Sequence, residues 1–313
     1  YEPATKPTLY FIGVTTSKSS IMNLFPKWAE YLRLGDCEIK GVDFLPNDET
    51  KKYQECVEFI KNDPLSKGAL VTTHKIDIFL SCADQFDYLD EHSTTMGEIS
   101  CISKDGNKLL GHAKDPISSD LALNRILPED YWKEKDGEVL CLGAGGAAIS
   151  ILYNLNRQRQ QGNHPSKIFV TDIRKSRLES IQKIYRKFDT NIPIELHQCS
   201  EIKNNDELTT NLKPHSLIIN ATGLGKDKPG SPFTWDVQYP QNSIVWELNY
   251  RGELIFLDQA ETQRNKKNLT IHDGWIYFIH GWLEVIAEVF QMEIKNSGDY
   301  FENLSEIAWS IRK

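Results

Sequence analysis

The sequence lacks long hydrophobic runs and any excess of positive charge. No apolar stretch approaches the ~20 residues that a membrane-spanning helix requires, and no signal peptide precedes the first predicted strand, although the chain begins without Met and its true N-terminus is left open. The formal net charge of -8 comes from interspersed charges of both signs, without the basic stripe that nucleic-acid binding requires. We expect a protein that binds neither membrane nor nucleic acid.

The chain also lacks paired cysteines. Its six cysteines are scattered without a C-x-x-C pair, at Cys37, Cys56, Cys82, Cys101, Cys141 and Cys199. This pattern is typical of reduced packing residues in a cytoplasmic protein, and it argues against a disulfide framework and against a zinc site. A length of 313 residues is sufficient for two domains and a sizeable core.

The stretch at residues 138–150, EVLCLGAGGAAIS, is the element around which the chain is organised. Its apolar start predicts a buried parallel strand, its glycines permit a tight turn close to a ligand, and the helix that follows would direct its N–H groups at a pyrophosphate. The predicted cofactor-binding residues are Gly143, Ala144, Gly145, Gly146 and Ala147. Because G-x-G-G-A-A falls short of the full G-x-G-x-x-G, a plain strand–turn–helix of a doubly wound sheet stays open as the alternative.

A second strand at residues 167–170 ends at Asp172. An acidic residue in this place accepts hydrogen bonds from the adenosine ribose and repels a 2′-phosphate, which favours NAD over NADP. Arg174 follows closely and offers a clamp for a phosphate instead, and Asp172 is also suited to a simple helix N-cap. The prediction is NAD, with NADP possible.

Strands and helices alternate along the chain, which is typical of α/β proteins. In the first part, strands are predicted at 8–14, 38–45 and 68–72, helices at 21–34, 50–62 and around 77–86, and a hairpin about the Asp-Gly turn at 104–107. After a connecting helix at 119–126, strands are predicted at 138–142, 167–170, 192–197, 216–220 and 243–248, and closing helices at 283–290 and 301–311. We predict an N-terminal α/β substrate domain, residues 1–121 completed by 283–313, and a doubly wound Rossmann-like nucleotide domain, residues 122–282.

Several stretches, in the right order, resemble the shikimate dehydrogenase family over nearly the whole chain. Residues 16–20 keep both serines of the family's H-S-x-S-P loop, residues 71–75 (VTTHK) resemble V-T-x-P-H-K without its Pro, and residues 111–115 (GHAKD) correspond to G-x-N-T-D. Residues 143–148 are similar to GAGGAA, residues 220–225 (NATGLG) to N-A-T-x-x-G, and residues 247–250 (ELNY) stand where the family has D-x-x-Y.

The resemblance implies roles for particular residues. Lys75 would exchange the proton of the substrate hydroxyl, and Asp115 would hold the pair in position. Taken singly, each residue is better explained as a surface Lys or a helix-capping Asp, and it is their joint match to the pattern that favours catalysis. Ser17 and Ser19 would bind the carboxylate, although a Ser at a helix start is also a good N-cap. Thr72 and Tyr250 would line the substrate site, and Asn220, Thr222 and Gly223 would contact the cofactor.

The departures from the family's patterns affect the substrate site. In G-A-x-N-T the family's Asn binds ring hydroxyls, whereas the counterpart at residues 97–101 offers Ser100, and the N-T of G-x-N-T-D has become Ala113-Lys114. The family's Gln in G-x-x-M-L-x-x-Q falls at His280 or Gly281, after Trp275. A site built for particular hydroxyls loses affinity steeply when its partners change, so shikimate itself is doubtful. Lys114, His280 and Trp275 suggest a pocket of different shape, with room for a further anionic or bulkier group, and solvent-facing charge and ordinary core packing stay open as the alternative.

These observations predict an NAD(P)-dependent oxidoreductase that interconverts a hydroxyl and a ketone on a small carboxylate, expected to be cyclic. The partner would be that small molecule, with an oligomer possible. A catalytically silent metabolite- or nucleotide-binding module of the same fold is the alternative, because a fold does not by itself establish an activity.

Overall fold

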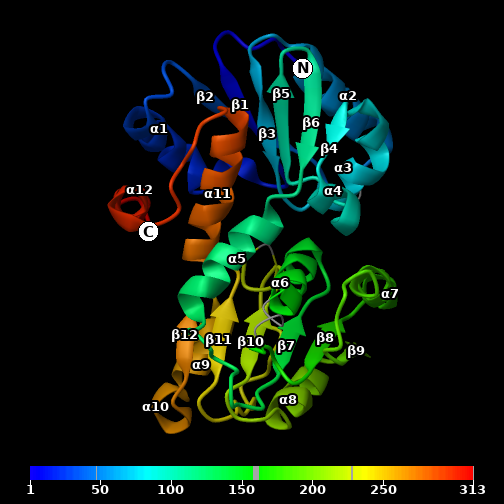
Figure 1. Ribbon diagram of the computed structural model, residues 1–313, viewed down its shortest axis with the longest axis vertical. Coiled ribbons are helices and arrows are strands. Elements are labelled where there is room, and N and C mark those ends of the chain that lie inside the picture. Colours follow the sequence, from blue (N-terminus) through cyan, green and yellow to red (C-terminus); the bar gives the residue numbers. More distant parts are fainter. Residues whose placement is uncertain (47, 158–161, 227, 313) are drawn as a thin grey trace. The chain divides into compact units, whose positions relative to one another are not determined.

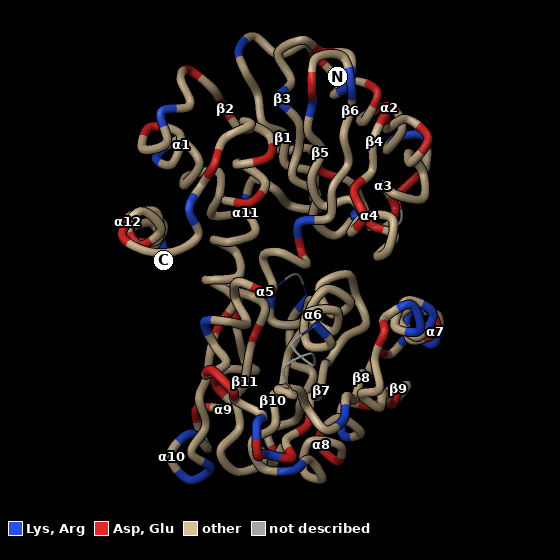
Figure 2. The backbone as a smooth tube through the Cα atoms, in the orientation of Figure 1, with Lys and Arg blue, Asp and Glu red and all other residues tan. Residues whose placement is uncertain are grey.

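The computed structural model describes residues 1–46, 48–157, 162–226 and 228–312. It divides into two compact units, a first unit of Tyr1–Ser118 with Ile279–Lys313 and a second unit of Ser119–Phe278. The divisions fall inside helices α5 (Asp115–Ile126) and α11 (Trp275–Val289), a few residues from the domain boundaries expected from the sequence. Charges of both signs are spread over both units (Figure 2).

The first unit contains a mixed six-stranded sheet in the order β2-β1-β3-β5-β6-β4 (Figure 1). Its strands are β1 (Thr8–Gly13), β2 (Glu38–Asp43), β3 (Ser66–Val71), β4 (Tyr88–Leu89), β5 (Cys101–Asp105) and β6 (Lys108–His112). β1 pairs in parallel with β2 and β3, whereas β5 and β6 form an antiparallel hairpin in which Asp105 pairs with Lys108. The predicted Asp-Gly turn is confirmed.

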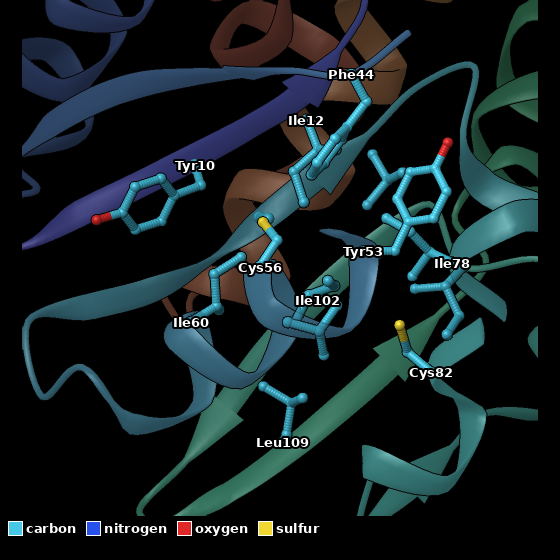
Figure 3. Close-up of a cluster of buried hydrophobic side chains, with 14 residues drawn as sticks. Tyr10, Ile12, Phe44, Tyr53, Cys56, Ile60, Ile78, Cys82, Ile102 and Leu109 are labelled. Carbon is cyan, nitrogen blue, oxygen red and sulfur yellow. The ribbon is translucent and has the colours of Figure 1, made fainter. Parts of the chain in front are cut away.

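The helices of this unit are α1 (Ile21–Leu32), α2 (Thr50–Asn62), α3 (Lys75–Cys82), α4 (Glu91–Met96), the beginning of α5, most of α11, and α12 (Gly298–Trp309). Side chains from β1, α2, α3 and the β5–β6 hairpin meet in one apolar cluster (Figure 3). Ile12, Cys56 and Ile102 are fully buried in it. Each large apolar side chain removed from water contributes about 1.5–3 kcal/mol, so this cluster fixes α3 on the sheet.

The second unit contains a six-stranded parallel sheet in the order β12-β11-β10-β7-β8-β9. Its strands are β7 (Val139–Leu142), β8 (Ile168–Asp172), β9 (Ile194–Gln198), β10 (Leu217–Asn220), β11 (Ile244–Glu247) and β12 (Thr270–His272). Its helices include α6 (Gly146–Arg157), α7 (Lys175–Tyr185), α8 (Ile202–Thr210), α9 (Ile255–Glu261) and α10 (Arg264–Lys267). The strand order reverses between β7 and β10, and a doubly wound sheet binds ligands beyond the carboxyl ends of the strands at such a point.

Several elements were not predicted or begin elsewhere than expected, and β12 and α11 show why. The edge strand β12 is only three residues long, too short to give an alternating pattern, and was not predicted. Helix α11 begins at Trp275 rather than at Leu283, because residues on nearly all of its faces are apolar and hide the helical period. Among the described residues, no helix has the length and apolar character that a bilayer span requires.

All six cysteines are free thiols, as predicted. Five of them are buried and Cys37 is half-buried. Their role is packing: Cys56 and Cys82 belong to the apolar cluster of the first unit. Among the described residues, no group of three or more His, Cys, Asp or Glu side chains is arranged to hold a metal ion.

Candidate active site and nucleotide-binding edge

Lys75 and Asp115, the predicted catalytic residues, form an ion pair in the first unit. Lys75 is the first residue of α3 and Asp115 the first of α5, and the Lys75 Nζ donates a hydrogen bond to Asp115 Oδ2. Their side chains are 18% and 12% exposed, respectively. Two oppositely charged groups that remain partly accessible are suited to exchange a proton with a ligand hydroxyl.

A strained turn places Lys75 at the start of its helix. After β3, the backbone N–H of Thr72 bonds to Ile12 O, and Thr73 then takes a φ of 60° while His74 N–H bonds back to Thr72 O. This i to i+2 bond about a residue with positive φ is the pattern of a strained γ-turn, and a β-branched residue rarely occupies that region. The buried ring of His74, whose Nδ1 lies 3.0 Å from Tyr53 Oη, anchors the turn to α2. The turn replaces the longer, Pro-containing segment of the family's pattern.

A third ionisable group, Glu98, lies beside this pair and was not among the predicted site residues. It follows Gly97, the left-handed C-cap of α4, and the next residue, Ile99, donates its backbone N–H to Lys75 O at 3.0 Å. Glu98 is 1% exposed, and among the described residues neither of its carboxylate oxygens has a hydrogen-bond partner. Burial, and secondarily the charge of Asp115, raises the pKa of Glu98 to about 8.

The electrostatics of Lys75 follow from these neighbours. Burial by itself would lower the pKa of the Lys75 ammonium, because the charged form loses its hydration. The charges of Asp115 and Glu98, together with the hydrogen bond to Asp115, outweigh burial and raise the pKa above its ordinary value. Lys75 is therefore held as a cation that its carboxylate neighbours stabilise.

Ser100 and Lys114 are engaged in contacts within the first unit. Ser100 Oγ accepts the backbone N–H of Lys114 at 2.7 Å, and Ser100 is 3% exposed. The Lys114 ammonium donates to Glu288 Oε2 on α11 at 2.7 Å, and Glu288 also lies 3.3 Å from His112 Nε2. The charge of Lys114 is thus matched inside the protein, which removes the reason for assigning it to a further anionic ligand group.

The remaining predicted substrate-binding residues of the first unit occupy different surroundings. Ser17 is exposed in the short 3-10 turn Thr16–Lys18, whereas Ser19 is 6% exposed and Thr72 is half-buried. The turn itself is anchored by Thr16 N–H, which donates to Asp43 Oδ1 at 2.8 Å. His280 is 1% exposed and stacks on Phe301 of α12, with ring centroids 4.5 Å apart.

In the second unit, the predicted cofactor residues gather at the carboxyl ends of β7, β8 and β10. Gly143 has a φ of 99°, and a Cβ there would lie 2.9 Å from Ala221 O, so only glycine allows the two loops to approach. A Cβ on Gly145 would meet nothing within 4 Å, and Gly146 begins α6. Open space beside a glycine turn and a helix N-terminus together fit a dinucleotide pyrophosphate.

Asp172 holds the glycine turn against β8. Its Oδ2 accepts the backbone N–H of Ala144 at 3.0 Å, and its Oδ1 accepts that of Arg174 at 2.8 Å. The Arg174 Nε lies 3.8 Å from Asp172 Oδ1, and its side chain is 55% exposed. Figure 2 shows that Lys and Arg also mark helix α7, which begins at Lys175. Both features weighed for cofactor choice, the carboxylate and the basic group, are present at this edge.

Asn220 and Thr222 form a hydrogen-bonded turn next to the glycine turn. Asn220 Oδ1 accepts from the Thr222 N–H at 3.0 Å and from Oγ1 at 2.6 Å, and Asn220 Nδ2 donates to the Glu247 carboxylate. Glu247 also accepts the Asn249 N–H at 2.8 Å. Burial raises the pKa of Glu247 to about 8. The hydrogen bonds act in the opposite direction, because they favour the charged form, but burial is the larger effect. Gly223 is exposed at the tip of the turn.

Tyr250 and Trp275 pack together in the second unit. The Tyr250 ring centroid lies 5.3 Å from that of Trp275 and 4.3 Å from that of Phe278. Trp275 is 1% exposed, so its role in the structure is core packing. The structure thus assembles Lys75, Asp115 and Glu98 in one unit and the glycine turn, Asp172 and Asn220 in the other.

A parallel sheet with Rossmann strand order, a glycine turn at its switch point and a companion α/β unit define a two-domain α/β protein with a Rossmann-type fold. No family model matches the chain. A shikimate dehydrogenase (NADP(+)) of Caldicellulosiruptor saccharolyticus is 27% identical over 227 residues, 71% of this chain and 72% of that protein. Among solved structures, the shikimate dehydrogenase of Aquifex aeolicus has a TM-score of 0.70 at 19% identity, covering 99% of each chain. A quinate dehydrogenase from Corynebacterium glutamicum, in complex with NAD, also reaches 0.70 at 16% identity, covering 97% of this chain and 99% of that one.

The chain is thus similar to shikimate dehydrogenases in sequence and in fold, which confirms the resemblance inferred from its motifs.

Proposed function

We propose that the protein is an NAD(P)-dependent oxidoreductase that interconverts a hydroxyl and a ketone on a small cyclic carboxylate related to shikimate or quinate. The observation that carries the proposal is the largely buried Lys75–Asp115 ion pair, which stands at the positions implied by the family's patterns. Relatives named shikimate dehydrogenase (NADP(+)) and a structural neighbour named quinate dehydrogenase support this reaction class.

The residues divide the chemistry between them. A bound nicotinamide would take or give the hydride, while Lys75 exchanges the hydroxyl proton and Asp115 keeps the ammonium in place. Ser17 and Ser19 would bind the substrate carboxylate at the start of α1, and Thr72, Ser100, Tyr250 and His280 remain proposed substrate-binding residues. Ser100 is the weakest of these, because its hydroxyl oxygen already accepts the Lys114 N–H.

The cofactor would be held by the glycine turn at residues 143–147 and by Asn220, Thr222 and Gly223. We propose a preference for NAD, because the Asp172 carboxylate accepts ribose hydroxyls and repels a dianionic 2′-phosphate. Arg174 is the opposing feature, since its exposed guanidinium lies beside that carboxylate and offers a partner to NADP. Both cofactor types occur in the names of similar proteins.

A catalytically silent binding module is the second candidate, and one observation favours it. The segment in which the family has a hydroxyl-binding Asn provides only Ser100, whose Oγ is occupied by a backbone contact. A site without its hydroxyl-reading group can keep affinity for a ligand and lose turnover.

The test is to follow the absorbance of reduced nicotinamide with a panel of cyclic hydroxy acids and their ketones, for the wild type, Lys75→Ala and Lys51→Ala. An enzyme is expected to lose turnover by about 10²–10⁴-fold in Lys75→Ala, the usual contribution of a positioned acid or base. The exposed Lys51 on α2 serves as the matched control and is expected to change turnover little. Binding by calorimetry without turnover, for any member of the panel, would favour the silent module.

A further inference from the structure

Glu98 is the buried ionisable group that the proposed reaction leaves unused. Its carboxyl is 1% exposed, and among the described residues it has no hydrogen-bond partner at either oxygen. Buried carboxyls in proteins are normally paired or hydrogen-bonded, because an isolated one costs several kcal/mol of desolvation. Such a group persists for a reason other than stability, and here it lies beside the Lys75–Asp115 pair.

The backbone fixes Glu98 at this place. Gly97 ends α4 with a φ of 68°, a conformation that suits glycine, and turns the chain so that Ile99 N–H bonds to Lys75 O. The segment carrying Glu98 is therefore tied to the first residue of α3 itself. In the family's G-A-x-N-T pattern this position is Ala, so the carboxyl is an addition to the site in this chain.

We propose that Glu98 is a positioning residue that acts through Lys75: when ionised it keeps the proton on the Lys75 ammonium, and when protonated it makes that proton easier to release. The inference rests on the proposed function, in which Lys75 exchanges the substrate hydroxyl proton. It adds that Glu98, which is absent from the family's pattern, determines how easily Lys75 releases that proton.

The charges around Glu98 determine whether its carboxyl is ionised or protonated. Lys75 favours the ionised carboxyl, while Asp115 at the start of α5 and Asp90 at the N-cap of α4 both favour the protonated one. With Glu98 protonated, the Lys75–Asp115 pair is neutral as a whole; with Glu98 ionised, the three groups together carry one negative charge. Ionisation therefore strengthens the hold on the Lys75 proton and also disfavours the approach of an anionic substrate.

The experiment measures the Lys75 amine directly and needs no turnover. Competitive labelling with trace acetic anhydride between pH 6 and 12, read by peptide mass spectrometry, reports the midpoint at which Lys75 becomes nucleophilic. Glu98→Gln is expected to lower this midpoint by roughly one pH unit, because one neighbouring negative charge is lost. Glu91→Gln removes an exposed carboxylate from the same helix–turn segment and is expected to leave the midpoint unchanged.

A second variant, Glu98→Ala, guards against misfolding of the first, since Ala is the residue of the family's pattern and also removes the charge. An unchanged Lys75 midpoint in either folded variant overturns the inference, whether or not a substrate has been found. Wild-type protein with ¹³C-labelled Glu carboxyls supplies an independent measurement: one resonance, identified as the one missing from either variant, is expected to titrate far above the ordinary Glu range. If the resonance that is missing from the variants titrates in the ordinary range, the inference fails, whatever the resonance of Glu247 does.

If turnover is observed, the pH profile of kcat/KM for alcohol oxidation distinguishes this role from a merely structural one. Its rise is expected to move to lower pH in Glu98→Gln in parallel with the labelling midpoint. A loss of activity with an unmoved profile would mean that Glu98 supports packing only. The proposed function fails separately, if no substrate turns over while the labelling shift is still present.

Discussion

Glu247 in the second unit and Glu98 in the first are both almost fully buried, and burial raises the pKa of each to about 8. Their surroundings differ. Glu247 accepts hydrogen bonds from Asn220 and Asn249 and thereby ties β10, β11 and the turn after Asn220 together. Glu98 has no hydrogen-bond partner among the described residues, and the neighbour that most favours its ionised form is the Lys75 ammonium.

The same contrast extends to the two regions. At the proposed nucleotide-binding edge, the side chains of Asp172, Asn220 and Glu247 all form hydrogen bonds with neighbouring groups, so the buried polar groups of this edge support one another. Near Lys75, the structure holds the Glu98 carboxyl, which forms no hydrogen bond with any residue that the structure describes, and a β-branched residue, Thr73, at positive φ. Strain and unmatched polarity tend to gather where a protein acts on its ligand, which agrees with chemistry on this side.

The largest effect is expected from removing the Glu247 carboxylate in the second unit. Glu247→Ala removes the acceptor of two buried donors, and each orphaned donor costs about 1–3 kcal/mol. We expect the free energy of unfolding at pH 6, measured by urea denaturation, to fall by about 4 kcal/mol, including the lost packing. Glu207→Ala on the exposed face of α8 is the matched control and should change stability by less than about 0.5 kcal/mol. Equal stability of both variants would contradict the framework role of Glu247.

The second effect is the contribution of Glu98 to the pH dependence of the free energy of unfolding. A Glu whose pKa is raised on folding binds more protons in the folded state, so its contribution to stability is greatest below the unfolded pKa and is lost as pH rises to about 8. We expect Glu98→Gln to remove part of this loss, so that the variant gains about 2 kcal/mol relative to wild type between pH 5 and pH 9. Urea denaturation across this range measures it, and parallel pH profiles for the two proteins would show that Glu98 is ionised normally.

Glu98 also shows where inference from the sequence ends. Lys75 and Asp115 were predicted because each stands in a short local pattern, and the Rossmann sheet because its strands are continuous apolar runs. The significance of Glu98 depends on burial, which arises only when α4 and β5 pack beside α3. The one available signal was an acidic residue next to the buried run 99–103, at a position that is Ala in the family's pattern.

Other differences have similar causes. Lys114 was considered for an anionic ligand group, and its partner Glu288 could not be foreseen because it is 174 positions away in sequence, a distance that no local pattern spans. Trp275 was considered for the pocket, but it is buried in contact with Phe278 within the second unit. The start of α11 was missed because an apolar helix has no polar face to reveal its period.

A third effect concerns cofactor choice at the proposed nucleotide-binding edge. Asp172→Asn removes the charge that repels a 2′-phosphate, so the ratio of NAD to NADP affinity is expected to fall by roughly tenfold, equivalent to about 1.4 kcal/mol. Asn keeps one acceptor oxygen, so one of the contacts to Ala144 and Arg174 is weakened and some NAD affinity is lost as well. Side-by-side titrations by nucleotide fluorescence measure the ratio, with Glu179→Gln on α7 as the control. Tighter binding of NADP than NAD by the wild type would show that Asp172 is not the ribose ligand.

The smallest effect is expected from relieving the strained turn at Thr73, directly before His74 and Lys75 in the first unit. Thr73→Gly relieves a side chain held at a φ of 60°, but glycine also gives the unfolded chain more conformational freedom. Since strain of this kind costs about 1–3 kcal/mol and the added freedom about 0.5–1, a net gain of about 1 kcal/mol in the free energy of unfolding is expected. Arg33→Gly is the matched control, because Arg33 has a φ of 55° but is not β-branched and lies at the C-cap of α1. A gain in Arg33→Gly as large as that in Thr73→Gly would mean that the turn before Lys75 stores no special strain. A gain confined to Thr73→Gly, accompanied by a broader Lys75 labelling profile, would mean that the strain holds the ammonium in place.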